Sequence, residues 1–184
     1  YGGTTKTAGK KIFNRIHDRF AGKIPQAQEF RNYRLSNPHV FELFKALSQA
    51  VGVHESLEFL IAVSDFKRQP SAKAAQAIVE KFIAPSAVDD FGMPIDDETK
   101  MQINMADDEA RKALIQSVKS LSLHAESGGD DKAMQLAGVF DPTERNIALF
   151  FDRAMNNQLT LLRQQKSLAD SAPAFANHRP VSFA

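Results

Sequence analysis

The chain of 184 residues contains no cysteine and no tryptophan. Without cysteine it has no disulfide, no thiolate metal site and no cysteine nucleophile. This composition suits a reducing compartment, and we expect a cytoplasmic protein. Because tryptophan is absent, the aromatic part of the core must be built largely from the 14 phenylalanines. Apolar residues make up 43% of the chain, which predicts a folded domain rather than disorder.

Sequence signatures of catalysis and of nucleotide binding are also missing. The chain has no G-x-x-x-x-G-K-[ST], G-x-G-x-x-G or G-x-S-x-G segment. Its five histidines share no metal-ligand spacing, and its pairs of adjacent aspartates do not follow the spacing of a Ca²⁺-binding loop. We therefore expect no enzyme activity, no metal and no cofactor, and we attribute the aspartate pairs to helix capping and loop solvation.

The net charge is +1, so no overall positive field points to nucleic acid as a partner. The charge is nevertheless unevenly distributed along the chain. Residues 1–35 hold eight basic and two acidic residues, a net charge of +6, whereas residues 85–111 hold two basic and eight acidic residues, a net charge of −6. No apolar run approaches the roughly 20 residues that a membrane span needs.

The basic N-terminal segment has the pattern of an amphipathic helix over residues 9–21. Ile12, Ile16 and Phe20 recur every four residues and define one apolar face. The other faces carry four cations, which are Lys10, Lys11, Arg15 and Arg19. A basic amphipathic helix can lie on an anionic membrane surface, so these four residues are candidate membrane contacts. In the alternative interpretation the apolar face packs on the core and the cations are simply solvated.

Three further helices are predicted at residues 38–51, 54–68 and 71–84. Asn37 and Pro38 provide an N-cap and a first-turn proline for the first of them. The segment 54–68 is apolar on nearly every face, which is typical of a central, buried helix. The residues from Pro85 to Pro94 are predicted to form a loop.

The second half of the chain is also predicted to be helical. Asp96 is expected to cap a short helix, and Asp107 or Asp108 the next one. Residues 126–131 form a glycine-rich break. Residues 141–166 have the pattern of one long helix or two in tandem, with Asp141 as the cap. No segment alternates with the period of two that strands show, so we predict an all-α fold.

Four segments between Phe41 and Thr99 resemble, in order, the sequence pattern of the regulator-of-G-protein-signalling (RGS) family. Residues 55–68, ESLEFLIAVSDFKR, resemble the family's E-N-[LI]-x-F-W-x-A-x-x-x-[FY]-[KR]. Phe44 and Leu47 stand where the family has F-x-x-F. Residues 72–83, AKAAQAIVEKFI, resemble K-A-x-x-I-y-x-x-F-[LI], and residues 94–100, PIDDETK, resemble N-[LI]-D-x-x-T-[KR].

The resemblance implies an RGS-like multi-helix bundle over residues 36–166, with an insertion at about 104–139 that carries an extra helix before the last helices. Residues 1–35 would then be a basic N-terminal helical extension, and residues 167–184 a tail.

Members of this family bind the switch segments of a Gα subunit and accelerate its GTP hydrolysis without donating a catalytic group. The two asparagines through which the family touches the switches fall here on Ser56 and Pro94. The family's late-helix contacts fall on Ala154, Met155 and Gln158. The candidate Gα contacts of this chain are therefore Glu55, Ser56, Pro94, Asp96 and Gln158. Of the residues through which the family contacts Gα, only Glu55 clearly survives.

Because the core pattern is kept and the contact pattern is mostly lost, we expect a protein-interaction domain in, or targeting, heterotrimeric G-protein signalling. It would have weak or no GTPase-activating activity and would belong to a larger scaffold or to a pathogen effector. Two alternatives stay open. One is an active Gα GTPase-activating protein, and the other is a peripheral membrane or lipid-binding helical domain.

Overall fold

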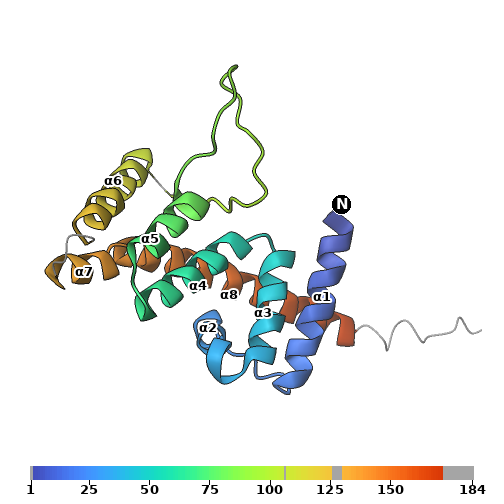
Figure 1. Ribbon diagram of the computed structural model, residues 1–184. Coiled ribbons are helices and arrows are strands. Elements are labelled where there is room, and N and C mark those ends of the chain that lie inside the picture. The colour runs from blue at the N-terminus through green and yellow to red at the C-terminus, as the bar shows by residue number, and fades with distance from the viewer. Residues whose placement is uncertain (1, 106, 126–129, 172–184) are drawn as a thin grey trace, which may run out of the picture. The chain divides into compact units, whose positions relative to one another are not determined.

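A computed structural model of the chain describes residues 2–105, 107–125 and 130–171. These residues form helices joined by loops, with no strand among them (Figure 1). The predicted all-α class is therefore confirmed for this part of the chain. The chain divides into two compact units, one made of Tyr1–Gly52 and Asp152–Ala184 and the other of Val53–Phe151.

The first unit contains α1 (Gly2–Arg19), α2 (Ala27–Ser36), α3 (Pro38–Ala50) and the part of α8 (Asp141–Ser171) that follows Phe151. Both α1 and α2 pack against α3. The rings of Phe30 and Phe44 stack with centroids 4.8 Å apart and planes 7° from parallel. The other fully buried large side chains of this unit are Phe13, Ile16, Val40, Leu47 and Met155.

The ends of α3 follow the sequence signals. Asn37 Oδ1 accepts a hydrogen bond from the backbone N–H of Val40, and Pro38 occupies the first turn, as predicted. After the helix, Gly52 adopts a φ of 81°, a left-handed conformation that costs glycine little.

The N-terminal segment is part of the first unit rather than an extension beside it. Arg31 of α2 forms two hydrogen bonds with Asp152 of α8, from Nε to Oδ1 at 2.8 Å and from Nη2 to Oδ2 at 2.7 Å. The backbone N–H of Ala27 donates to Asn156 Oδ1 at 2.8 Å. The units of the structure thus differ from the division at residues 35 and 166 that the resemblance implied.

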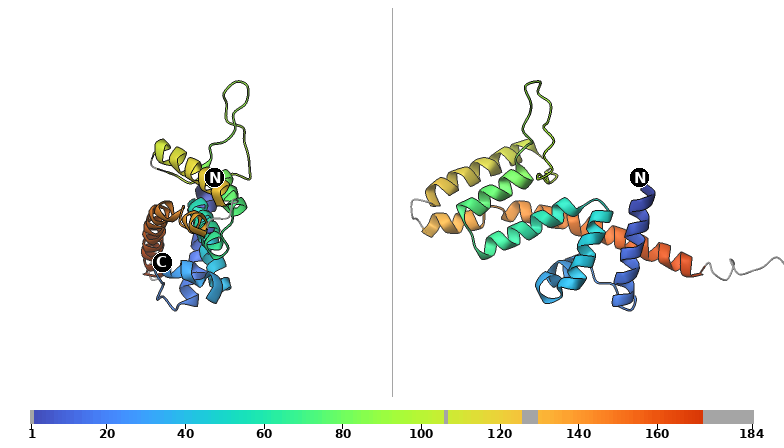
Figure 2. Two further views of the ribbon diagram at one scale, coloured as in Figure 1. Left: turned by 60° about the vertical axis from the view of Figure 1, so that its left-hand side comes forward. Right: turned by 45° about the vertical axis from the view of Figure 1, so that its right-hand side comes forward.

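The second unit contains α4 (His54–Arg68), α5 (Ala72–Ile78), the π-helix η1 (Val79–Ile83), α6 (Asp108–Ala125), α7 (Asp130–Ala137) and the first part of α8. Within it α5 packs against α4 and α6, and α6 packs against α7 (Figures 1 and 2). The segment predicted to be central does bury most of its apolar residues, namely Leu57, Phe59, Leu60, Val63 and Phe66.

The helix expected over residues 71–84 is present but changes its winding. Ser71 caps it by accepting a hydrogen bond from Ala74 N–H at 3.0 Å. At Val79 the α-helix widens into η1, and the N–H of Ala84 reaches back to the carbonyl of Val79 at 2.7 Å. This π-helical turn was not predicted, because the spacing of apolar residues in the sequence does not distinguish it from the end of an α-helix. Its buried residues are Val79, Phe82 and Ile83.

The short helix that Asp96 was expected to cap is absent, so that prediction is wrong. Residues 95–105 have no helical assignment. The N–H groups of Met101 and Ile103 donate instead to the carbonyls of Lys81 and Phe82, at 2.9 and 3.0 Å. Because these donors are already used by η1, they cannot build a helix of their own.

The start of α6 is confirmed. Asp107 Oδ1 accepts a hydrogen bond from the N–H of Glu109 at 2.9 Å, and its carbonyl accepts one from Arg111. Of the predicted break at 126–131, residues 126–129 lie outside the described residues, and residues 130 and 131 belong to α7. The described residues of the range 104–139 thus form two helices, α6 and α7, where one extra helix was expected.

The last helix, α8, is continuous from Asp141 to Ser171. Its hydrogen bonding begins one residue before the predicted cap, because the N–H of Glu144 donates to the carbonyl of Phe140 at 2.7 Å. The carboxylate of Asp141 forms an ion pair with Lys67 Nζ at 2.8 Å. Residues 167–171, predicted to be tail, are helical, and residues 172–184 lie outside the described part of the chain.

Candidate partner-binding surface

The first two predicted contacts lie at the start of α4 and differ in exposure. The side chain of Glu55 is 38% exposed, and its Oε1 lies 3.6 Å from His54 Nε2. In the first helical turn this carboxylate also complements the positive end of the helix dipole. Ser56 is only 6% exposed, because it shares a buried helix face with Leu60 and Val63. The expected surface contact at Ser56 is therefore contradicted.

Pro94 belongs to a small hairpin within the loop between η1 and α6, which projects from the helices of its unit (Figures 1 and 2). We call residues 87–95 the tip hairpin. Asp89 Oδ1 accepts hydrogen bonds from the N–H groups of Phe91 and Met93, each at 2.9 Å. Gly92 has a φ of 77°, and Val88 pairs with Pro94 in an antiparallel bridge. These interactions fix the turn locally.

The tip hairpin exposes an unusual amount of apolar surface. Phe91 is 91% exposed. Its exposed apolar neighbours are Val88, Met93 and Ile95. Phe91 was not among the predicted contacts, although a large apolar residue between Asp90 and Gly92 in a turn is a sequence signal for an exposed aromatic side chain. Exposed aromatic side chains on a fixed turn are suited to burial against a partner.

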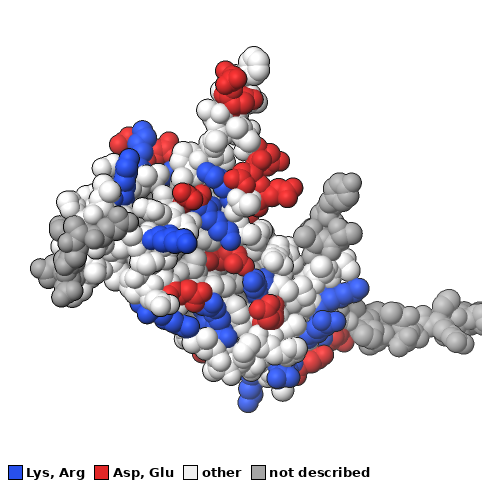
Figure 3. Space-filling model, viewed as in Figure 1, with Lys and Arg blue, Asp and Glu red and all other residues white. Residues whose placement is uncertain are grey.

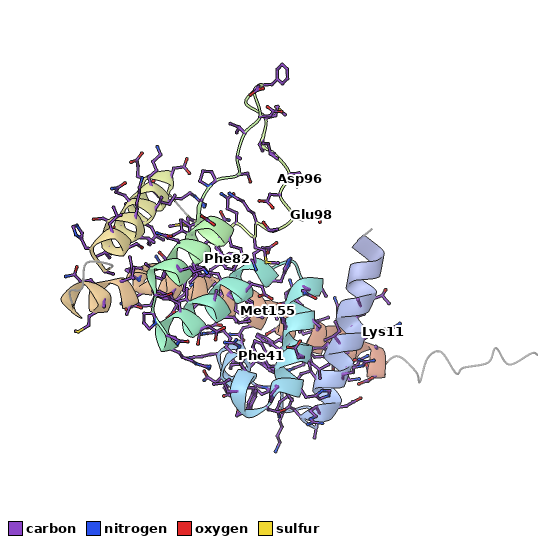
Figure 4. All side chains as sticks on the ribbon, in the orientation of Figure 1. Lys11, Phe41, Phe82, Asp96, Glu98 and Met155 are labelled. Carbon is purple, nitrogen blue, oxygen red and sulfur yellow. The ribbon has the colours of Figure 1, made fainter. Side chains whose placement is uncertain are left out.

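Acidic side chains surround this apolar tip. Figure 3 shows them gathered along the projecting loop, and Figure 4 labels Asp96 and Glu98 on it. Both residues are exposed. The side chain of Thr99, and then its backbone N–H, donate to Asp97 and lower the pKa of that carboxyl below its usual value. The loop therefore presents negative charge at neutral pH.

The base of the loop is tied to the helices by side chains. Lys100 Nζ donates to the carbonyl of Pro85 at 2.9 Å, and Gln102 Nε2 donates to that of Ala84 at 3.0 Å. The guanidinium of Arg111 in α6 bridges the carbonyls of Ile83 and Ile103. The tip hairpin thus rises from a fixed base.

The late-helix contacts are in the other unit. Gln158 is half-buried, and Met155 beside it is completely buried. The structure thus places Glu55, Ser56, Pro94 and Asp96 within one unit and Gln158 in the other.

The four candidate membrane contacts, Lys10, Lys11, Arg15 and Arg19, are all exposed on α1 (Lys11 is labelled in Figure 4). The apolar side of the same helix is used for packing, since Phe13 and Ile16 are 1% and 0% exposed. Insertion of this side into lipid would require α1 to leave α3. What α1 offers to a membrane in this structure is mainly its positive charge.

Within the described ranges, no group of three or more His, Asp or Glu side chains is arranged to hold a metal ion. None of the helices seen there is both long and apolar enough to cross a membrane. Comparison of the chain with protein-family models, with curated proteins and with solved structures finds no match.

Proposed function

We propose that the chain is an RGS-homology protein-interaction domain in, or targeting, heterotrimeric G-protein signalling, with weak or no acceleration of GTP hydrolysis. The observation that carries the proposal is the core of the second unit. The two longest RGS-like segments form α4 and the α5–η1 helix. Phe59 and Phe82, one from each segment and each at a position where the family has phenylalanine, are in ring contact there.

The loss of the family's contact residues supports weak activation. Ser56 is buried, and Pro94 has neither a side-chain donor nor a backbone N–H. Met155, a further family contact position, is buried as well. Family members act through contacts that fit the Gα switches best in the transition state, so each missing contact lowers the rate enhancement directly.

The surface that remains is suited to binding without activation. Glu55 is half-exposed at the start of α4, and the tip hairpin offers Phe91 with exposed carboxylates around it. A Gα surface with an apolar recess and basic residues nearby would be complementary to this loop. Binding through such a loop need not hold the Gα switches in their transition-state conformation.

Single-turnover GTP hydrolysis by several Gα classes tests the absence of activation. We expect the native domain to leave the hydrolysis rate within about twofold of that of Gα alone. Pro94→Asn, which restores the family's residue at an exposed position, should raise the rate if the loop docks as in the family. Val88→Asn, at the residue bridged to Pro94 across the tip hairpin, is the matched control. Strong stimulation by the native domain would favour the active GTPase-activating alternative instead.

The lipid-binding alternative is favoured by one observation, the four exposed cations of α1. It is weakened by the packing of Phe13 and Ile16 inside the protein. Sedimentation with anionic vesicles tests it, with the double variant Lys11→Glu/Arg15→Glu as the comparison. A salt-sensitive association that this variant abolishes would support an electrostatic membrane contact.

A further inference from the structure

The second unit contains a cavity of about 670 Å³ lined by the first turns of α6 and α8 and by Asn104, Met105 and Asp107. Its inner wall includes Leu114 and Ile147, which are 8% and 4% exposed, and Phe150 at its edge is 51% exposed. This volume lies in the range of roughly 300–1,000 Å³ that small-molecule sites occupy. None of the candidate Gα contacts lines it.

The polar groups of the cavity are few. Asn104, Ser117, Thr143 and Asn146 provide neutral donors and acceptors. Among the described residues that line it, Asp107 is the one that is ionisable. In the part of the chain that the structure describes, no lysine or arginine lines the cavity. A ligand carboxylate or phosphate would therefore find no cation there, whereas a ligand cation would find a carboxylate.

The basic residues next to Asp107 in sequence are already engaged. Arg111 donates to the carbonyls of Ile83 and Ile103. Lys112 lies 3.7 Å from Glu109 in an exposed ion pair. The carboxylate of Asp107 accepts a hydrogen bond from the N–H of Glu109 through Oδ1.

The size of the cavity favours a small molecule over a partner helix as its ligand. An α-helix with its side chains is about 10 Å wide and rises 5.4 Å per turn, so one turn fills roughly 400 Å³. The cavity would therefore take in only a short part of a partner helix. A compact ligand can bury most of its surface in the same volume.

We propose that this cavity binds a small amphiphile that carries an apolar body and one basic amine. The apolar body packs on Leu114, Ile147 and Phe150, and the ammonium group is held by Asp107. This site is independent of the proposed Gα-binding surface, and the one proposal can fail without the other.

Three probes with the same ten-carbon chain test the proposal, namely decylamine, decanol and decanoate. Each is titrated below its micelle concentration into the full chain, and binding is followed by isothermal calorimetry. We expect decylamine to bind at least tenfold more tightly than decanoate, with decanol between them. No saturable binding of decylamine, or equal binding of decanoate, would overturn the proposal.

Two variants on α6 locate the binding site. Ala113 is exposed and lines the cavity, so Ala113→Trp should fill it and weaken all three probes at least tenfold. Gln116 is exposed on the same helix but does not line the cavity, so Gln116→Trp should leave binding within about twofold. Undiminished binding to Ala113→Trp would show that decylamine binds elsewhere and would refute the site.

Asp107→Asn removes the negative charge but keeps the shape of the side chain, and asparagine can still cap α6. The variant should lose the preference for decylamine over decanol while decanol binds as before. An unchanged preference would refute the role of Asp107. If Ala113→Trp changes the melting temperature measured by circular dichroism, Ala110→Trp takes its place, because it fills the same cavity from one helical turn earlier. It should weaken the binding of all three probes in the same way.

Discussion

The ring of Phe59 in α4 meets the ring of Phe82 in η1 edge to face, with centroids 5.7 Å apart and planes at 73°. Phe140 extends this contact, since its ring centroid lies 6.4 Å from that of Phe59 and 5.4 Å from that of Phe66. All four rings are buried. This cluster joins α4, η1 and the residue preceding α8 in the centre of the second unit.

Replacing Phe59 with alanine should lower the free energy of unfolding by about 3–5 kcal/mol, because the ring is completely buried and leaves a cavity. Urea denaturation followed by circular dichroism measures the loss. Phe150→Ala, on a ring that is 51% exposed, is the control and should cost much less. A loss below about 1 kcal/mol for Phe59→Ala would contradict the packing described.

The Arg31–Asp152 pair should stabilise the first unit. Both side chains are partly buried, at 24% and 19% exposure, and the two hydrogen bonds are charge-assisted. Asp152→Asn should therefore cost about 1–3 kcal/mol. A double-mutant cycle with Arg31→Met isolates the interaction. Arg153→Gln, at the exposed neighbouring position, is the control, and a coupling energy near zero would argue against the pair.

Because of Lys67, the free energy of unfolding should depend on pH in the alkaline range. Burial lowers its pKa, but hydrogen bonds to Asp141 and Glu144, together with their charges, outweigh this and raise the pKa above its ordinary value of 10.5. A raised pKa contributes stability that is present below 10.5 and lost as the pH rises through the higher folded-state value. Lys67→Met should thus be less stable than the native chain at pH 8.

The difference between Lys67→Met and the native chain should shrink at pH values above 10.5. Denaturant titrations across this range measure it. Lys73→Met, at an exposed position of α5, serves as the comparison. A difference in unfolding free energy that stays constant through the alkaline range would show that Lys67 acts through packing rather than through its charge.

The N-terminal helix should be required for folding of the first unit. Deleting residues 1–22 removes Phe13 and Ile16 from the core, and we expect loss of the cooperative transition of that unit. Lys10→Gln/Lys11→Gln, which changes only exposed charges of α1, should alter stability by no more than about 0.5 kcal/mol. A stable truncated chain that has lost only vesicle binding would instead indicate a detachable membrane helix.

Much of the helical framework followed from local signals in the sequence. Asn37 with Pro38, Ser71 and Asp107 each mark a helix start because a side-chain oxygen can accept a hydrogen bond from the first turn. Phe59 and its apolar neighbours predicted a buried helix because they cover several faces. These features depend on residues close together in the chain.

The features that were missed depend on contacts between distant residues. The carbonyls of Lys81 and Phe82 take the donors that the predicted helix after Asp96 would have needed. The burial of Ser56 is set by the packing around Leu60, and no local pattern reveals it. The cavity beside Ala113 requires α6 and α8, which are separated in the chain by α7, and its lining residues carry no motif.

Binding of the purified chain to Gα subunits tests the central claim most directly. Biolayer interferometry against several Gα classes, each in the GDP, GTP-analogue and GDP–aluminium-fluoride states, is the measurement. We predict binding to at least one class with an affinity that depends on the nucleotide state. Phe91→Ser should weaken it by about tenfold, near 1.4 kcal/mol, whereas Leu123→Ser, at an exposed position of α6, should not. Absence of binding to every Gα class in all three states would contradict the account.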